Sequence, residues 1–272
     1  MYCFINGNIL PVEEAKIGIT DIGLLRSYAV FDYMRTYNGK PFGFEDYIVR
    51  FRNSAESLRL QLNYTDEEIK STIIRLVEKS NVKEAGVRLL LTGGYSSDSI
   101  SFDNPNFIIV IEKLPVYPSS YYQHGVKLIT DEFQRAVAGS KTTDYLNAIK
   151  LEPIKKEKGA FDILYHKNNL VLEVARNNIF FFKNNTLITP KDDILKGITR
   201  KHVLLLAKDH FKIEERAVSV SEMWDMDEVF LTGTSKKIIP VVQIDEQHFS
   251  NGKPGANTKK LMEVFDVFVN NY

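Results

Sequence analysis

Three kinds of residue that can do chemistry occur in one half of the chain. Lys141 stands in the segment Gly139-Ser140-Lys141-Thr142-Thr143-Asp144-Tyr145, and Glu173 follows further along. Beyond them come Gly197-Ile198-Thr199-Arg200 and Thr232-Gly233-Thr234. A lysine amine can bond covalently to a carbonyl carbon, and a carboxylate can keep a ring nitrogen protonated. Glycine-bearing turns at a helix start offer backbone amides to a phosphate.

These three abilities together are what pyridoxal 5′-phosphate requires of a protein. The sequence therefore predicts a site for this cofactor, with Lys141 as its covalent attachment and Glu173 at its ring nitrogen. Gly197, Ile198 and Thr199 would bind the phosphate from a helix start, and Gly233 with Thr234 would complete the cup. The alternatives are an ordinary turn at each glycine, with Thr199 as the helix N-cap.

Glu173 ends an apolar run, Leu170-Val171-Leu172. Burying an unpaired carboxylate costs several kcal/mol or more, so this side chain requires a buried partner. The partner is the cofactor nitrogen in the functional interpretation. In the alternative it is an arginine or a lysine in a salt bridge.

The order of these motifs resembles the class IV, or fold-type IV, pyridoxal-phosphate enzymes. That family holds the branched-chain and D-amino-acid aminotransferases and aminodeoxychorismate lyase. The resemblance runs through nearly the whole chain. Its motifs are Phe4-Ile5-Asn6-Gly7, Val30-Phe31-Asp32, Arg50-Phe51-Arg52-Asn53-Ser54-Ala55, Asn178-Ile179-Phe180, Leu195-Lys196-Gly197-Ile198-Thr199-Arg200, Asp227-Glu228-Val229-Phe230-Leu231-Thr232-Gly233-Thr234, Pro240-Val241 and Pro254-Gly255.

The resemblance implies roles for single residues. It aligns Lys141 with the Schiff-base lysine, which also moves a proton between the substrate Cα and the cofactor. It aligns Arg50 with a phosphate-binding arginine, although a solvated helix arginine is the alternative. Tyr145 would bond the phenolic oxygen of the cofactor. Asn178 would also contact the cofactor and Phe31 the substrate, although a turn residue and a core aromatic are equally consistent.

Several positions depart from the family pattern, and they bear on the substrate. Arg26 stands where the aminotransferases carry a substrate-facing tyrosine, and Arg176 where a small or acidic residue is usual. The loop at residues 92–98 lacks the Arg-x-His carboxylate trap of the bacterial D-amino-acid enzymes. We therefore expect Arg26 and Arg176 to bind the substrate carboxylate, because a guanidinium pairs with it best. The alternative is that Arg176 pairs with an acid and Arg26 points to solvent.

Three functions compete. The first is an aminotransferase that acts on D-amino acids and 2-oxo acids such as 2-oxoglutarate, with a branched-chain L-amino-acid enzyme second. Another is an aminodeoxychorismate lyase, which is disfavoured because the loop at residues 92–98 also lacks the arginine that those lyases carry near this point. The third is a catalytically idle binding protein, which has no need of both Lys141 and Glu173.

Composition narrows the partners. The 272 residues carry 35 basic and 35 acidic side chains, so nothing indicates a nucleic-acid or anionic-membrane surface. The start of the chain lacks a secretory signal, no apolar run is long enough for a bilayer, and we expect a cytoplasmic protein. Cys3 is the only cysteine, which excludes an intrachain disulfide, and no metal site is expected. The resemblance implies a homodimer.

The elements that must position these residues form an α/β chain of the α+β type in two domains. We expect a small α/β domain at residues 1–114, a linker at 115–124 rich in proline and serine, and a larger cofactor-binding domain at 125–272. The small domain contains hairpins and helices at about 45–60 and 66–80, the second opened by a capping box. The larger domain has a mixed, barrel-like sheet with helices at about 145–158, 199–211 and 257–269.

Overall fold

A computed structural model describes all residues, 1–272, and divides them into two compact units. The first unit contains Met1–Pro115 and Ser140–Asp144, and the second contains Val116–Gly139 and Tyr145–Tyr272. Each unit is built on one sheet with flanking helices, and the sheet of the second unit is curled. This mixed architecture confirms the expected fold class. None of the helices combines the length and the apolar character needed to cross a bilayer.

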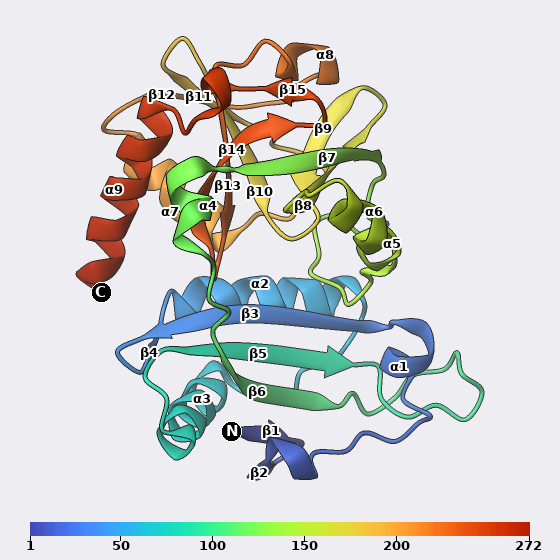
Figure 1. The fold of residues 1–272 in the computed structure, drawn as a ribbon. Coiled ribbons are helices and arrows are strands. Elements are labelled where there is room, and N and C mark those ends of the chain that lie inside the picture. The colour runs from blue at the N-terminus through green and yellow to red at the C-terminus, as the bar shows by residue number, and fades with distance from the viewer. The chain divides into compact units, whose positions relative to one another are not determined.

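The first unit contains a six-stranded antiparallel sheet in the order β2-β1-β6-β5-β3-β4. Two long helices pack against it, and α2 runs along β3 (Figure 1). The strands are β1 (Tyr2–Ile5), β2 (Asn8–Pro11), β3 (Ala29–Tyr37), β4 (Lys40–Pro41), β5 (Ala85–Thr92) and β6 (Phe107–Lys113), and the helices are α1 (Ile22–Arg26), α2 (Phe44–Ser57) and α3 (Asp66–Ser80).

Local sequence explains the two long helices of this unit. Thr65 and Glu68 form the expected capping box, with each side chain bonded to the other residue's backbone amide, so α3 begins at Asp66 as predicted. In α2 the buried residues recur at the helical period and include Phe51, whose ring lies 6.0 Å from that of Phe107 in β6. These contacts fix α2 on the sheet.

Residues 140–144 pack with the first unit, although the sequence assigned them to the domain at 125–272. The reason is backbone pairing with the start of β3. The amide of Phe31 donates to the carbonyl of Lys141 at 2.9 Å, and the amide of Thr143 donates to the carbonyl of Ala29 at 3.0 Å. The short bridge between Val30 and Thr142 therefore carries Lys141 on the frame of the first unit.

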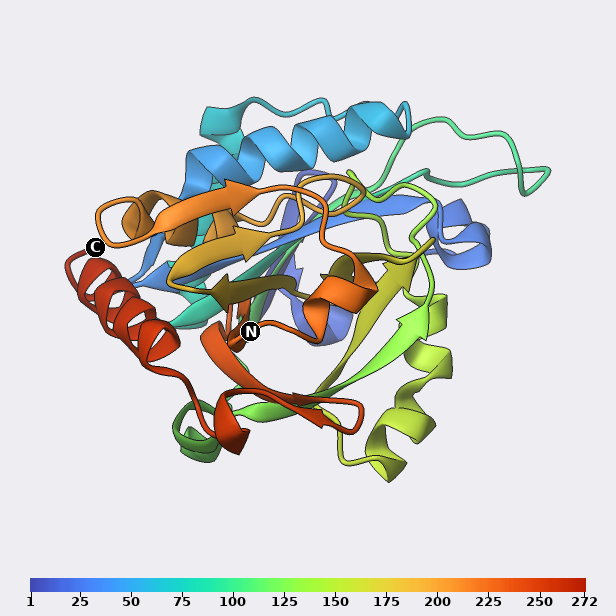
Figure 2. The ribbon, with the colours of Figure 1, turned by 90° about the horizontal axis from the view of Figure 1, so that it is seen from above.

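The second unit contains a nine-stranded mixed sheet in the order β12-β11-β10-β13-β14-β7-β8-β9, with β15 paired to β14. Figure 2 shows it curled, with α9 along one side and the short helices α5 and α6 along another. Its strands are β7 (Val126–Glu132), β8 (Asp162–Lys167), β9 (Leu170–Val174), β10 (Asn178–Lys183), β11 (Thr186–Thr189), β12 (Lys212–Glu215), β13 (Glu228–Gly233), β14 (Lys237–Ile244) and β15 (Gln247–His248).

The helices of this unit differ from the expectation in two places. The expected linker at 115–124 contains a short helix, α4 (Ser119–His124), and residues 116–124 group with the second unit. The single helix expected at 145–158 is two helices, because Pro153 lacks an amide proton and starts a new helix more easily than it continues one. The other helices are α5 (Leu146–Lys150), α6 (Glu152–Glu157), α7 (Ile198–Ala207), α8 (Val220–Met223) and α9 (Ala256–Asn270).

Alternation along β10 and β13 builds the core of the second unit. Ile179 and Phe181 belong to one buried cluster with residues of β7, β8 and β14. Their neighbours Phe180 and Phe182 point to the opposite face, where Phe180 stacks on Phe230 at 4.9 Å between ring centroids. Both faces are thus buried. Since Asn178 pairs with Thr232, the start of β10 and the end of β13 lie at the same end of the sheet.

Candidate functional site

In the first unit, Lys141 is half-buried and lies beside an aromatic ring. Its Nζ is 4.5 Å from the ring centroid of Phe31, a distance at which a cation is attracted to the ring face. Its backbone amide donates to Ser54 Oγ at 3.1 Å, and Ser54 in turn donates to the carbonyl of Arg50 at 2.9 Å. Ser54 therefore connects the backbone of Lys141 with helix α2.

Arg50 is held by a buried carboxylate. Its Nε and Nη2 donate to the two oxygens of Asp32 at 2.9 and 2.6 Å, and Asp32 is fully buried in β3. This two-bond geometry fixes the plane of the guanidinium. Arg50 is therefore largely buried and paired, and it is not the solvated helix arginine of the alternative interpretation.

A second arginine of this unit, Arg88 in β5, was missed by the sequence reasoning. Its guanidinium carbon lies 5.7 Å from the ring centroid of Phe31 and 5.2 Å from that of Tyr33. Glu112 accepts from its Nε at 2.5 Å and from its Nη2 at 3.0 Å. Phe31 thus lies next to two cations, Lys141 and Arg88. The available signal was a charged residue between the core residues of an apolar strand.

Arg26 is exposed at the end of α1. Its Nη1 donates to the carbonyl of the preceding residue, Leu25, at 2.9 Å. Arg26 is therefore exposed to solvent, as the alternative interpretation expects. Its hydrogen bond goes to Leu25 and not to Phe31 or Lys141.

In the second unit, Glu173 is 7% exposed and pairs with a partly buried arginine, Arg135, which is the partner that the salt-bridge alternative expects. Arg135 donates to its Oε1 from Nε at 2.8 Å and from Nη2 at 2.7 Å, while the amide of Leu195 donates to its Oε2 at 3.0 Å. Arg135 also bonds the carbonyl of Ala138. Sequence reasoning predicted a partner for Glu173 but did not identify Arg135. The arginine's position in the segment just before Lys141 was its only local signal.

Tyr145 lies within electrostatic reach of Arg135 and Glu173. Burial of the phenol raises the pKa of Tyr145, with Arg135 opposing that shift and Glu173 adding to it. The hydroxyl therefore stays protonated to a higher pH than an exposed tyrosine, and it can donate a hydrogen bond.

The start of α7 leaves its first backbone amides without a side-chain cap. Gly197 is the N-cap residue, and no side chain caps the helix, so the alternative that Thr199 caps it is wrong. Asn178 holds the preceding loop by accepting from the amide of Gly197 at 3.2 Å and donating to the carbonyl of Leu195 at 2.7 Å. A Cβ at residue 197 would lie 2.2 Å from Asn178 Oδ1, which explains the glycine.

The turn after β13 has a similar construction. The amide of Lys236 donates to the carbonyl of Gly233 at 3.1 Å and closes a turn that contains Thr234. A Cβ at Gly233 would lie 2.6 Å from Asn177 Oδ1. The hydroxyl of Thr232, which precedes the turn, is buried without a hydrogen-bond partner.

Arg176 forms an ion pair, as its alternative interpretation expects. Its Nε lies 3.4 Å from Oδ2 of the buried Asp162, whose carboxylate raises the pKa of Arg176. The arginine side chain is 50% exposed, so it also faces solvent.

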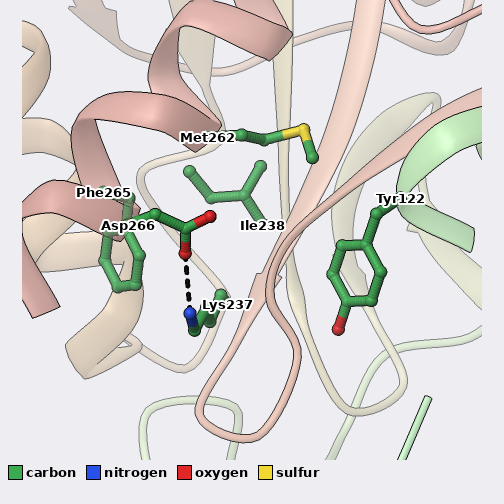
Figure 3. A pocket seen from close by; sticks show the side chains of 6 residues that line it. All are labelled: Tyr122, Lys237, Ile238, Met262, Phe265 and Asp266. Atoms are coloured by element: carbon green, nitrogen blue, oxygen red, sulfur yellow. Dashed lines mark hydrogen bonds and ion pairs between the residues drawn. The ribbon is translucent and has the colours of Figure 1, made fainter. Parts of the chain in front are cut away.

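These residues fit the chemistry of pyridoxal 5′-phosphate. The first-turn amides of α7 have no side-chain cap, which suits a phosphate. Lys141 and Arg50 of the first unit, and Glu173 and Tyr145 of the second, are each of a type that this cofactor can use. A separate small pocket between α4, β14 and α9 (Figure 3) contains none of the predicted residues, and its volume of about 20 Å³ has room for roughly one water.

The sequence model of the family described as Amino-transferase class IV matches residues 29–244. The chain is 29% identical to a D-alanine aminotransferase of Staphylococcus epidermidis over 99% of this chain and 98% of that protein. It is 31% identical to a putative branched-chain-amino-acid aminotransferase of Methanocaldococcus jannaschii, over 97% of this chain and 95% of the other.

Solved structures agree with the sequence relatives. A branched-chain aminotransferase from the thermophilic archaeon Thermoproteus uzoniensis, solved with norvaline, has a TM-score of 0.88 and 25% identity, covering 99% of this chain and 94% of that one. A second branched-chain amino acid aminotransferase, solved with pyridoxamine 5′-phosphate, has a TM-score of 0.90. A putative 4-amino-4-deoxychorismate lyase of Legionella pneumophila has a TM-score of 0.85 and 25% identity, covering 94% and 96%. The fold is therefore common to proteins with different named activities.

The ion pair between Glu173 and Arg135 should stabilise the folded protein. Arg135→Met should lower the free energy of unfolding by about 3 kcal/mol, because it leaves a buried carboxylate without its guanidinium. Arg52→Met is the control: its pair with Asp66 is much more exposed, and its loss should cost about 1 kcal/mol or less. Urea denaturation of the cofactor-free protein measures both. Equal losses of unfolding free energy in the two variants would contradict the conclusion that Arg135 neutralises a buried carboxylate.

Proposed function

This chain belongs to the class IV aminotransferases, and we propose that within this family it transfers an amino group between a D-amino acid and a 2-oxo acid such as 2-oxoglutarate. Pyridoxal 5′-phosphate is the cofactor of the family. The observation that carries the assignment of roles is the start of α7, whose first-turn amides have no side-chain cap and can bind the phosphate of this cofactor. D-amino acids rank first because D-alanine aminotransferases match over 99% of the chain.

Lys141 is the proposed catalytic residue. When bound, the cofactor supplies an aldehyde carbon for the amino group and a ring that delocalises the electrons left by Cα deprotonation. The amine of Lys141 would hold the cofactor through that aldehyde between turnovers and, when free, would move the proton at the substrate Cα. The bonds of its backbone to Phe31 and Ser54 support this role, since they fix the point from which the side chain extends.

Glu173 is proposed to hold a proton on the ring nitrogen. A guanidinium next to a carboxylate favours its charged form, so Arg135 supports Glu173 as the anion that this role requires. The Leu195 amide fixes the second carboxylate oxygen and leaves the group little freedom to turn. Tyr145 is the proposed donor to the phenolic oxygen, because its raised pKa keeps the hydroxyl protonated.

The phosphate is proposed to bind the amides and hydroxyl of Ile198 and Thr199 at the helix start that follows Gly197, with the Gly233–Thr234 turn as the second half of the cup. The uncapped first turn of α7 supports this, since a helix N-terminus favours an anion. Asn178 contributes by holding the loop that leads to the helix. Arg50 is proposed as the guanidinium partner, and its two bonds to Asp32 would orient it for that role.

The substrate carboxylate is proposed to bind an arginine. Arg88 is proposed as the first of three candidates, because it and Lys141 both lie beside the ring of Phe31, although Glu112 accepts from its Nε and Nη2. Arg26 and Arg176 stay predictions from the sequence. The exposure of Arg26 leaves it accessible to a ligand or to another subunit, and the pair of Arg176 with Asp162 occupies one edge of its guanidinium.

We propose a homodimer, which is supported by large apolar side chains that solvent would otherwise meet: Ile19, Leu24, Leu146 and Ile149 are 67–79% exposed. The cytoplasmic location expected from the sequence stays a prediction. A branched-chain L-amino-acid aminotransferase and an aminodeoxychorismate lyase are the alternatives, since proteins with these names share the fold.

Lys141→Ala should abolish turnover and prevent borohydride from fixing the cofactor to the chain, because the amine is lost. Peptide mapping by mass spectrometry after reduction measures this directly. Lys150→Ala, which removes an exposed lysine of α5, should leave the labelled peptide unchanged. A labelled peptide that lacks residue 141 would refute the assignment.

A panel of donors should separate the three activities. D-alanine with 2-oxoglutarate should give D-glutamate, whereas L-leucine and aminodeoxychorismate should react more slowly by about two orders of magnitude or more. Chiral chromatography of the product, with a coupled assay for pyruvate, provides the measurement. Faster turnover of L-leucine would establish the branched-chain alternative, and pyruvate release from aminodeoxychorismate would establish the lyase.

Replacing Arg88 should affect the substrate rather than the cofactor. Arg88→Met should raise the KM for both D-alanine and 2-oxoglutarate about tenfold or more, because a charge-assisted bond to the carboxylate is lost, while cofactor affinity changes little. The matched control is Arg75→Met on the exposed face of α3. The same measurement on Arg26→Met and Arg176→Met tests the other candidates. An unchanged KM in Arg88→Met would exclude it.

A further inference from the structure

Lys236 is a buried lysine in the turn that follows β13. Only 5% of the residue is exposed, and its Nζ donates to Oδ1 of Asn177 at 3.0 Å. The rings of Tyr117 and Phe161 lie at 5.8 and 5.6 Å from the same nitrogen. An ammonium group in such surroundings has given up most of its water, which is costly unless polar partners replace that water.

Asn177 connects this cation to a carboxylate. Its Nδ2 donates to Oδ2 of Asp162 at 3.0 Å, and Asp162 is 2% exposed. The carboxylate can only accept and the ammonium can only donate, so the amide between them has one favourable orientation. Asp162, Asn177 and Lys236 thus form an ion pair bridged by a side-chain amide, which we call the amide relay.

The amide relay joins two loops at the same end of the curled sheet. Asn177 lies in the turn between Glu173 and Asn178, and Lys236 closes the turn that begins at Gly233. Contact between the two turns is close, because a Cβ at Gly233 would lie 2.6 Å from Asn177 Oδ1. That oxygen cannot move away without breaking its bond to Lys236, and the amide as a whole is held by Asp162.

We propose that Asp162, Asn177 and Lys236 are positioning residues that set the Gly233–Thr234 turn for the phosphate of the cofactor. The inference rests on the proposed function of that turn. The relay does not touch the phosphate in this assignment. It fixes the backbone of Gly233 and Thr234 against the neighbouring turn, so that the phosphate meets donors already in place and less ordering accompanies binding.

The competing interpretation is that the relay only stabilises the fold. A merely structural relay would affect the binding of any ligand of this site equally. A relay that positions the phosphate-binding turn affects ligands with a phosphate and spares those without one. Pyridoxal and pyridoxal 5′-phosphate differ in this group alone, and both carry the aldehyde that Lys141 is proposed to bond.

The test compares the affinities of the cofactor-free protein for these two probes, measured by quenching of tryptophan fluorescence and by absorbance. Lys236→Met should raise the Kd for pyridoxal 5′-phosphate about tenfold or more and leave the Kd for pyridoxal within about twofold, since a charge-assisted bond of the relay is lost. Lys236→Arg, which keeps a charged donor, should restore part of the affinity.

Lys237→Met is the matched control. Lys237 is the next residue of the chain, but its Nζ pairs with Asp266 of α9 at 2.6 Å (Figure 3) and its side chain is 31% exposed. This variant should bind both probes like the unchanged protein. If Lys236→Met does not fold, Asn177→Ser, which removes the bridging amide, must show the same phosphate-specific loss.

The binding test separates the positioning role of the amide relay from the proposed function. An equal loss of affinity for both probes, or no loss for either, would overturn the positioning role and leave the proposed function intact. A phosphate-specific loss in Lys237→Met as large as that in Lys236→Met would also overturn it. Failure of the unchanged protein to bind pyridoxal 5′-phosphate at all would remove the proposed function, and this inference with it.

Discussion

The constraint on which the structure depends most is that a buried carboxylate must be paired. Glu173 ends a strand whose neighbours are apolar, and the second unit meets its charge with Arg135 and with the amide of Leu195. Those two partners come from segments far from β9 in sequence, one after β7 and one before α7. Since losing either bond would leave a buried charge underbonded, the pairing determines where both segments must lie.

The same constraint acts twice more. In the first unit, Asp32 is fully buried and fixes Arg50 with two bonds. In the second, Asp162 holds Asn177, through which it reaches Lys236. In each case the acid lies in or beside a strand, and the cationic or amide partner comes from a helix or turn with a proposed ligand role. Burial of the acids thus turns flexible polar side chains into fixed ones, which is what a preorganised binding site requires.

Local signals in the sequence were sufficient for some elements but not for others. The capping box at Thr65 fixed the start of α3, because both of its bonds lie within four residues. The need for a partner at Glu173 was also predictable from its apolar neighbours, but Arg135 was not, since that pairing depends on the curl of the sheet. Lys141 was assigned to the larger domain because its pairing with β3 spans more than a hundred residues. Pro153 was an available signal, and it begins a second helix within the range 145–158 where one helix was expected.

Lys236 and Lys237 show the limit of residue type as evidence. They are identical neighbours, yet one is buried against Asn177 and the other forms a half-exposed pair on α9. The backbone explains the difference: Lys237 has a φ of 57°, so the chain reverses between them and β14 starts with its side chain directed the other way. Asn177 lies close to Gly233, so the reversal leaves Lys236 as the lysine that bonds Asn177 on the buried side of the turn. The conformation of a single residue therefore decides which of two equal charges can contribute to the site.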